Sequence, residues 1–346
     1  MTTPQPPLQI DFIAYHHLQA QTGESVFDAL SRRHICRWLI GPNQKPTGAD
    51  AAVLLDHRGF QPELGKTPGG YRYLFHLSHD LGDLIVYLTE YLQDFDIVFV
   101  PTKLHKAVAS RALPESKIIV GGWPKYDRMQ IPAEQNALRI QIARFQHPFT
   151  VLYAPTYANT WEWLAILPPL FDLPVNVIVK NHIYVNPGQA FPKGQEEAYR
   201  ESLQSAGEME NSALVLNNPN VIVAPRTLNI CSLFPYVNML ISDSSSCTLE
   251  FLPFGDVAVE TGAGDSESTW QNTNPHSSKI TPEIRFVPLV QLRQILAGSG
   301  QFQEFLNSHR NRKPAEPFIT FDPGKPAGEF ISSCICDYLK DIRING

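Results

Sequence analysis

The sequence predicts an α/β fold built from two parallel sheets, each covered by helices. Three observations lead to this prediction. Short apolar runs alternate with helical segments along the chain, as expected for parallel strands joined by crossover helices. A turn dense in Gly and Pro, at residues 121–127, interrupts the alternation, and a second set of strands and helices follows it. The length of 346 residues suits two cores of about 150 residues each better than one.

The first half of the chain supplies the strands of one sheet. Each strand is predicted from a short apolar run, which is typical of strands buried on both faces. These strands span residues 10–15, 51–56, 71–77, 96–100 and 117–120. The helices between them span residues 23–33, 81–93 and 103–113. Polar residues follow the first strand at His16 and His17, and the third strand at Ser78, His79 and Asp80.

The second half supplies the other sheet. A helix at residues 133–145 precedes strands at 151–154, 176–180, 221–224, 239–242 and 257–260. Further helices are predicted at 161–171, 193–206, 228–236, 248–254, 287–296 and 330–339. Residues 262–278 are rich in Gly, Ser and Asn, and the length of this loop predicts a mobile lid. We therefore expect domains at 1–130 and 148–327, and a C-terminal helix at 328–346 that packs back on the first domain.

Composition and charge exclude several classes of protein. Hydrophobic residues make up 43% of the chain and charged residues 18%, which is typical of a globular protein. The net charge of −6 offers no basic excess for binding a nucleic acid backbone. An odd number of cysteines fits a reducing compartment, and no His, Cys, Asp or Glu spacing predicts a metal site. With no signal peptide and no membrane-spanning run in view, we expect a cytoplasmic protein.

The stretch at residues 239–254 is central to the functional prediction. A short apolar strand leads into Asp243, then Ser244, Ser245 and Ser246, and then a helix. Because the first N–H groups of a helix lack internal partners and its dipole favours negative charge, this turn predicts an anion site. The serine hydroxyls would donate to a phosphate, and Glu250, one turn into the helix, would accept from ribose hydroxyls. The alternative is a serine N-cap cluster beside a solvated Glu250.

Other strand ends add polar residues at the same edge of the predicted sheet. Residues 156–160 follow the strand at 151–154, and Asn181 and His182 follow the strand at 176–180. Ligands of doubly wound sheets bind outside the carboxyl ends of the strands. The first sheet offers a comparable end at His79. Two such sheets, facing each other across a cleft, would bracket a ligand.

Four segments resemble motifs of a known family. They are residues 122–127 (GWPKYD), 151–157 (VLYAPTY), 179–182 (VKNH) and 241–250 (ISDSSSCTLE). Their order and spacing over residues 70–260 resemble those of the CDP-glycerol glycerophosphotransferases, the polymerases and primases of teichoic acid. The resemblance implies the GT-B fold, which consists of two Rossmann-like domains.

The resemblance also implies roles for individual residues. Ser245 and Ser246, with Ser244 beside them, would hold the donor diphosphate, and Glu250 would face the ribose. His182 would contact the phosphates as part of the catalytic machinery, and Thr156 would lie near the donor. His79 would be the base that activates the acceptor hydroxyl, with His76 as the alternative for that role.

The last of these segments is also similar to a block of the UDP-N-acetylglucosamine 2-epimerases, another GT-B-like family. Other catalytic signatures are absent, since the sequence contains neither Gly-x-Ser-x-Gly nor a P-loop. Among the remaining basic residues, we expect His105 to be solvated on a polar helix. Lys180 and Arg226 are expected at the surface, as lone basic residues usually are.

The sequence thus predicts a transferase that moves a group from a nucleotide-diphosphate donor, such as a CDP or UDP conjugate, to a hydroxyl acceptor in cell-envelope polymer or glycan synthesis. The conjugate is a substrate, so no separate cofactor is expected. A lipid-linked acceptor would bring the protein to the inner membrane face, at most peripherally. Two alternatives remain open: a UDP-N-acetylglucosamine 2-epimerase-like isomerase, and a non-catalytic protein that keeps the nucleotide pocket.

Overall fold

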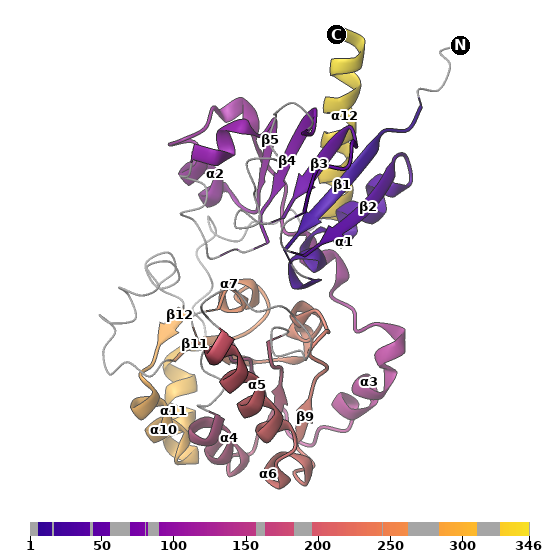
Figure 1. The fold of residues 1–346 in the computed structure, drawn as a ribbon. Coiled ribbons are helices and arrows are strands. Elements are labelled where there is room, and N and C mark those ends of the chain that lie inside the picture. Colours follow the sequence, from indigo (N-terminus) through magenta and orange to yellow (C-terminus); the bar gives the residue numbers. More distant parts are fainter. Residues whose placement is uncertain are drawn as a thin grey trace. The chain divides into compact units, whose positions relative to one another are not determined.

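A computed structural model describes residues 6–15, 17–41, 44–55, 70–79, 81, 90–156, 163–182, 196–243, 245–261, 284–309 and 326–345. The described chain forms two six-stranded sheets, and every strand pair in them is parallel (Figure 1). This confirms the predicted α/β fold class. The chain divides into two compact units, Met1–Arg128 with Glu316–Gly346, and Met129–Ala315.

The sheet of the first unit has the strand order β2-β1-β3-β4-β5-β6. Its strands are β1 (Gln9–Ala14), β2 (Ile35–Ile40), β3 (Ala51–Leu54), β4 (Tyr73–Leu77), β5 (Ile97–Val100) and β6 (Ile118–Val120). Short apolar runs form these strands because both faces of the sheet are buried. The edge strand β2 was not predicted, since Arg37 interrupts its apolar run and most of its residues are only partly buried.

Two helices cover one face of this sheet (Figure 1). They are α1 (His17–Ser31) and the C-terminal α12 (Ala327–Asn345), which pack against each other and against the same apolar cluster. The other face packs against α2 (Lys103–Ala109) and a 3₁₀ helix at Glu90–Asp94. The predicted helix at 81–93 lies largely outside the described residues.

The first turn of α12 is tied to the turn that interrupts the strand pattern. Asp127 accepts hydrogen bonds from the backbone N–H groups of Ala327, at 2.9 Å, and Gly328, at 2.7 Å. A carboxylate in this position satisfies N–H groups that lack partners within the helix and favours the positive end of its dipole. Arg128 pairs with Glu24 and Asp28 of α1. The motif at residues 122–127 therefore holds α12 to the first unit.

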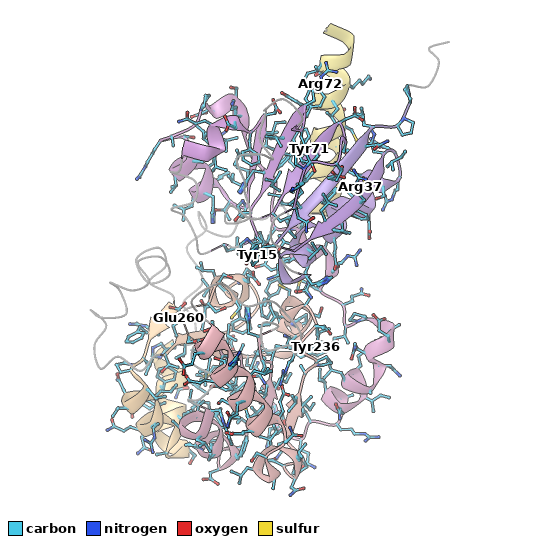
Figure 2. The ribbon with its side chains drawn as sticks, in the orientation of Figure 1. Tyr15, Arg37, Tyr71, Arg72, Tyr236 and Glu260 are labelled. Carbon is cyan, nitrogen blue, oxygen red and sulfur yellow. The ribbon has the colours of Figure 1, made fainter. Side chains whose placement is uncertain are left out.

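A buried carboxylate, Asp11, lies within β1. It accepts hydrogen bonds from Arg37 Nε at 2.5 Å, Thr47 Oγ1 at 2.5 Å and Tyr71 OH at 2.7 Å. Figure 2 labels Arg37 and Tyr71 on this sheet. Burial and the bond to Asp11 raise the pKa of the Tyr71 hydroxyl above its usual range. With three donors around it, the charge of Asp11 is compensated inside the sheet.

The sheet of the second unit has the strand order β12-β11-β10-β7-β8-β9. Its strands are β7 (Thr150–Tyr153), β8 (Asn176–Val179), β9 (Val221–Val223), β10 (Met239–Ser242), β11 (Val257–Glu260) and β12 (Ile284–Phe286). Counted from β7, this is the order 6-5-4-1-2-3 of a Rossmann sheet.

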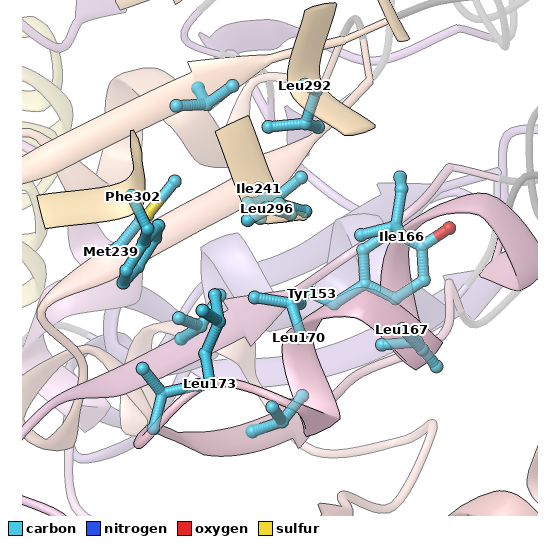
Figure 3. Packing of buried hydrophobic residues seen from close by; sticks show 14 of the residues in the cluster. Tyr153, Ile166, Leu167, Leu170, Leu173, Met239, Ile241, Leu292, Leu296 and Phe302 are labelled. Atoms are coloured by element: carbon cyan, nitrogen blue, oxygen red, sulfur yellow. The ribbon is translucent and has the colours of Figure 1, made fainter. Parts of the chain in front are cut away.

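The core of the second unit lies between this sheet and the helices that pack against it, and Figure 3 shows part of this packing. These helices are α4 (Trp163–Phe171), α5 (Glu196–Glu210), α10 (Leu289–Leu296) and α11 (Ser299–His309). Leu170, Ile166 and Leu296 are buried against strand residues that include Tyr153 and Ile241. The unit also contains α3 (Asn136–Ala143), α6 (Ala213–Leu216) and α7 (Cys247–Phe251).

Several boundaries differ from the sequence predictions. The segment predicted as a helix at 228–236 forms two 3₁₀ turns, Ile230–Ser232 and Phe234–Tyr236, and Pro235 lies within the second. Helix α11 was not predicted. The predicted lid at 262–278 lies outside the described residues. None of the described helices is both long and apolar enough to cross a membrane.

Candidate functional site

The strand order of the second sheet locates its switch point between β7 and β10. From β7 the chain builds outward through β8 and β9, and then returns to place β10 on the other side of β7. The loops that leave two such strands diverge to opposite faces, which opens a crevice at their carboxyl ends. Thr156 follows β7 and Asp243 follows β10, so both lie at this crevice.

One carboxylate joins the two strand ends at the switch point. Asp243 Oδ1 accepts a hydrogen bond from the backbone N–H of Thr156 at 2.6 Å, and Asp243 Oδ2 accepts one from the Thr156 hydroxyl. Beneath them, Ser242 Oγ donates to the carbonyl oxygen of Ala154 at 2.6 Å. Asp243 itself is buried. The predicted donor residue Thr156 is therefore held directly beside the serine turn.

The serine turn leads into the short helix α7. Ser245 and Ser246 are both partly exposed, and Ser244 lies outside the described residues. Ser245 Oγ faces the backbone N–H of Cys247 at 3.4 Å, and the Ser245 carbonyl accepts from Thr248 Oγ1 at 2.7 Å. In the described structure, the Ser246 hydroxyl caps no helix N–H group. Ser245 and Ser246, two of the three predicted phosphate-binding serines, are thus partly accessible and not part of a packed core.

Glu250 points into the interior of the unit. Its backbone N–H donates to the Ser246 carbonyl at 3.0 Å, which places both residues on one face of α7 as predicted from their spacing. Its side chain is 0% exposed, and Oε2 accepts a hydrogen bond from the thiol of Cys231 at 3.4 Å. The contact of Glu250 with a ribose stays a prediction. Glu260, at the end of β11, is equally buried and accepts from Thr248 Oγ1 at 2.6 Å.

Cys247, the first residue of α7, is not suited to act as a nucleophile. Burial raises the pKa of its thiol to about 12, and the carboxylates of Glu250 and Asp243 add to the rise, although hydrogen bonds with Ser242 and Ser245 oppose it. A thiol with this pKa carries almost no thiolate at neutral pH. The turn therefore offers hydroxyl groups, and not a reactive sulfur, to a ligand.

The end of β8 differs from the expectation that its basic residue lies at the surface. Lys180 is only 5% exposed, and its Nζ donates to the carbonyl oxygens of Asn181 at 2.9 Å and Arg226 at 2.8 Å. Arg226 forms a two-point pair with Glu210, at 2.9 and 2.6 Å. These bonds fix the loops around β8 and β9. His182 directly follows the buried residues Lys180 and Asn181 and is itself partly exposed.

The first sheet has its own switch point, between β1 and β3. Tyr15 follows β1, Leu55 follows β3, and His79 follows β4. His79 Nδ1 lies 2.9 Å from the Leu55 carbonyl oxygen, and Nε2 lies 3.4 Å from Nε2 of Gln19 in α1. The carboxyl edge of this sheet, where Figure 2 labels Tyr15, therefore carries the histidine predicted as a base.

Two other histidines of the first unit are buried. His76, the alternative base, lies within β4 and is buried. Its ring packs against the ring of Phe95, with the two ring centroids 5.4 Å apart. His105 was expected to be solvated, which is wrong. It is buried, with Nε2 3.0 Å from the Leu81 carbonyl and Nδ1 2.7 Å from Thr102 Oγ1. A helix that looks polar in sequence can thus bury one histidine against a loop.

Sequence reasoning missed three residues that shape these edges. Gln19 was read as part of a connection, because the predicted helix began at residue 23, whereas α1 begins at His17. Asp243 was read only as a turn residue, and Glu260 only as the end of a strand. The strand order, once known, points to Gln19 and Asp243, because it places the segments after β1, β3, β7 and β10 at the switch points. Among the described residues, no group of His, Cys, Asp and Glu is arranged to hold a metal ion.

The two parallel sheets, with their switch points, define an α/β protein of the GT-B fold. The chain is similar to a variant of the wall teichoic acid polymerase TagF, with a TM-score of 0.62 and 14% identity over 99% of this chain and 91% of that one. It is also similar to the UDP-GlcNAc 2-epimerase of Neisseria meningitidis bound to UDP-GlcNAc, with a TM-score of 0.55 and 13% identity over 96% and 100% of the two chains.

A third similar structure is the UDP-GlcNAc 2-epimerase of Methanocaldococcus jannaschii, with a TM-score of 0.54 and 13% identity over 95% of this chain and 100% of that one. No family model matches the sequence, and no curated protein matches it either. At these identities, the similar structures support the fold of the chain.

Proposed function

We propose that the protein is a transferase that binds a nucleotide-diphosphate donor at the carboxyl edge of its second sheet and moves the activated group to a hydroxyl acceptor. CDP-glycerol-like compounds and nucleotide sugars are the donor classes, and cell-envelope polymer or glycan synthesis is the proposed setting. A lipid-linked hydroxyl is one acceptor of this class. This function agrees with the motif resemblance to the CDP-glycerol glycerophosphotransferases.

The observation that carries the proposal is the pair formed by Asp243 and Thr156 at the switch point of a Rossmann-order sheet. Such switch points are the usual nucleotide sites of doubly wound sheets. Here the pair holds the Ala-Pro-Thr segment after β7 against the serine turn after β10. Two segments far apart in the sequence, both singled out by their resemblance to one family, thus meet at the edge where a donor would bind.

The proposed roles follow from the chemistry of the turn. The Ser246 hydroxyl caps no helix N–H group in the described structure and belongs to a partly exposed residue of the turn, and its hydrogen would donate to a diphosphate. Ser244 and Ser245 would add further donors, and His182 would contact the phosphates. Donors that are already in place stabilise the charge that develops on the departing nucleotide. Glu250 is buried in this structure, so its proposed contact with the ribose requires the turn to expose its carboxylate when the donor binds.

His79 is the proposed general base. It would take the proton of the acceptor hydroxyl as the acceptor oxygen bonds to the activated centre of the donor and the nucleotide leaves with the bonding electrons. A base of this kind usually contributes about 10²–10⁴-fold to the rate. We therefore expect His79→Gln to lower turnover by that factor while nucleotide binding persists.

An epimerase is the second candidate, because two of the similar structures are UDP-GlcNAc 2-epimerases that are covered over their whole length. It predicts conversion of UDP-GlcNAc with no acceptor present. A transferase predicts at most slow hydrolysis of the donor under the same conditions. The two outcomes are distinguished by analysing the sugar after incubation with UDP-GlcNAc alone.

The experiment that tests the proposed function is a thermal-shift series with CDP, UDP, GDP and ADP, followed by their glycerol or sugar conjugates. A ligand present at a hundred times its Kd stabilises the folded state by about 2.7 kcal/mol, so the preferred base should stand out. If no nucleoside diphosphate raises the melting temperature, the proposal is wrong.

A further inference from the structure

A buried glutamine, Gln19, connects the ends of two strands in the first unit. It lies in the first turns of α1 and is 1% exposed. Its Oε1 accepts a hydrogen bond from the backbone N–H of Tyr15, just after β1, at 2.6 Å. Its Nε2 faces Nε2 of His79, just after β4, at 3.4 Å. The side chain therefore extends from the end of β1 to the histidine.

The partners on both sides determine which atom of Gln19 faces His79. A backbone N–H can only donate, so the Gln19 atom at Tyr15 must be the amide oxygen. The other end of the amide is then the NH₂ group, which can only donate as well. The His79 nitrogen that it faces must accept.

The contact of the other ring nitrogen of His79 also indicates that Nε2 is the accepting atom. Nδ1 lies 2.9 Å from the carbonyl oxygen of Leu55, and a carbonyl can only accept. Nδ1 must therefore carry a hydrogen. In the neutral ring, Nε2 then carries the lone pair, which is the form that accepts a proton from an acceptor hydroxyl. Leu55 and Gln19 thus specify one tautomer through two independent contacts.

We propose that Gln19 is a positioning residue that holds His79 in the Nδ1–H tautomer with Nε2 as the proton-accepting atom. Its role in catalysis rests on the proposed function, in which His79 is the base. The 3.4 Å separation is longer than a usual N–H···N contact, so the amide is a weak donor that an acceptor hydroxyl can replace. Gln19 keeps the lone pair oriented until a hydroxyl arrives.

Close packing of α1 keeps this amide in place. A Cβ added to Gly23, one turn after Gln19, would lie 2.7 Å from Leu55 Cδ2 and 3.1 Å from the ring of Trp38. Helix α1 therefore approaches the end of β3 more closely than a larger residue would permit. The same approach brings Gln19 to the level of His79 and of the Leu55 carbonyl.

Nitrogen-15 NMR of the full chain tests the proposal without any substrate. The long-range couplings and nitrogen shifts of a histidine ring report which nitrogen carries the hydrogen, and His79→Gln identifies the signals. At alkaline pH, where the ring is neutral, we expect Nδ1–H and an unprotonated Nε2 in the unmodified protein. Nε2–H in that sample would overturn the inference.

Two variants separate positioning by Gln19 from a structural role. Gln19→Glu keeps the size of the side chain but presents oxygens that only accept, so Nε2 should become protonated. Gln19→Leu removes the donor, and we expect a mixture of tautomers. If both folded variants keep the tautomer of the unmodified protein, Gln19 does not set it. Because Gln19→Glu is isosteric, it remains informative even if Gln19→Leu fails to fold.

The outcome is distinguishable from failure of the proposed function. If turnover is found, Gln19→Glu should lower kcat more than it changes KM for the donor, because donor binding lies in the other unit. An Nδ1–H tautomer in a protein that binds no nucleotide would reject the proposed function and support the assignment of the tautomer to Gln19 and Leu55.

Discussion

Asp243 accepts hydrogen bonds from both the backbone N–H and the hydroxyl of Thr156, so one carboxylate joins the ends of two neighbouring strands. These strands, β7 and β10, flank the switch point of the second sheet. The pair links the two segments that are proposed to contact the donor. Its strength therefore decides whether the proposed site is formed before a ligand arrives.

We expect Thr156→Val to destabilise the second unit by about 1.5–3 kcal/mol, because the variant removes a hydrogen bond to a buried carboxylate. Valine keeps the shape of threonine and leaves the backbone bond intact. Thr227→Val, at an exposed position of the same unit, is the matched control and should destabilise less, because water can replace a hydrogen bond lost at the surface. Chemical denaturation measures both, and equal effects would contradict the proposed importance of the pair.

The cap of α12 by Asp127 gives a second prediction. Asp127→Ala should cost about 0.5–2 kcal/mol, since two N–H groups of the first turn lose their acceptor. Glu329→Ala, in the same turn, removes only an exposed ion pair with Arg32 and should cost at most about 1 kcal/mol. Amide hydrogen exchange at the start of α12 should accelerate in the first variant and hardly change in the second. Unchanged exchange in Asp127→Ala would show that the cap is dispensable.

Two helical glycines should respond to alanine in opposite directions. A Cβ at Gly328 of α12 would lie 2.6 Å from the backbone carbon of Ser25 in α1, so Gly328→Ala should destabilise by about 1–3 kcal/mol. A Cβ at Gly207 of α5 would meet nothing within 4 Å, so Gly207→Ala should stabilise by up to about 1 kcal/mol. Thermal unfolding of the two variants should shift with opposite signs. A stabilised Gly328→Ala would mean that the two helices are less tightly packed than described.

The thiol of Cys247 should remain unreactive in the folded protein. Its pKa of about 12 means that raising the pH from neutral towards 9 produces little thiolate at this position. Cys36, Cys334 and Cys336 are partly buried and should be alkylated first, although burial also raises the pKa values of Cys36 and Cys334. Peptide mass spectrometry after iodoacetamide treatment should find Cys247 labelled only after unfolding. Rapid labelling of the native protein would place this thiol at the surface.

The fold could be predicted because buried parallel strands leave a strong local signal. Runs such as Ile97–Val100 and residues 257–259 are apolar throughout, since helices or loops cover both faces of the sheet. The edge strand β2 gave a weaker signal, because Arg37 turns toward Asp11 and interrupts the apolar run. Strand order could not be predicted, since it depends on contacts between distant segments.

The site was only partly predictable for the same reason. The serine turn and His79 are visible as polar groups directly after apolar runs, whereas Gln19 becomes informative only once the ends of β1, β3 and β4 are known to be adjacent. Lys180 was misjudged because a lone lysine is usually solvated. Two backbone carbonyl oxygens accept hydrogen bonds from its ammonium group and make its burial possible. No sequence pattern indicates such backbone acceptors.

Calorimetric titration of CDP and UDP into the unmodified protein, Ser246→Ala and Ser308→Ala tests the central claim most directly. Ser308 is an exposed serine of α11 and serves as the control. We predict saturable binding of one nucleoside diphosphate, unchanged in Ser308→Ala and weakened about tenfold or more in Ser246→Ala, because a hydrogen bond to a charged phosphate is lost. Equal affinity in all three proteins, or no binding in any, would contradict a donor site at the serine turn.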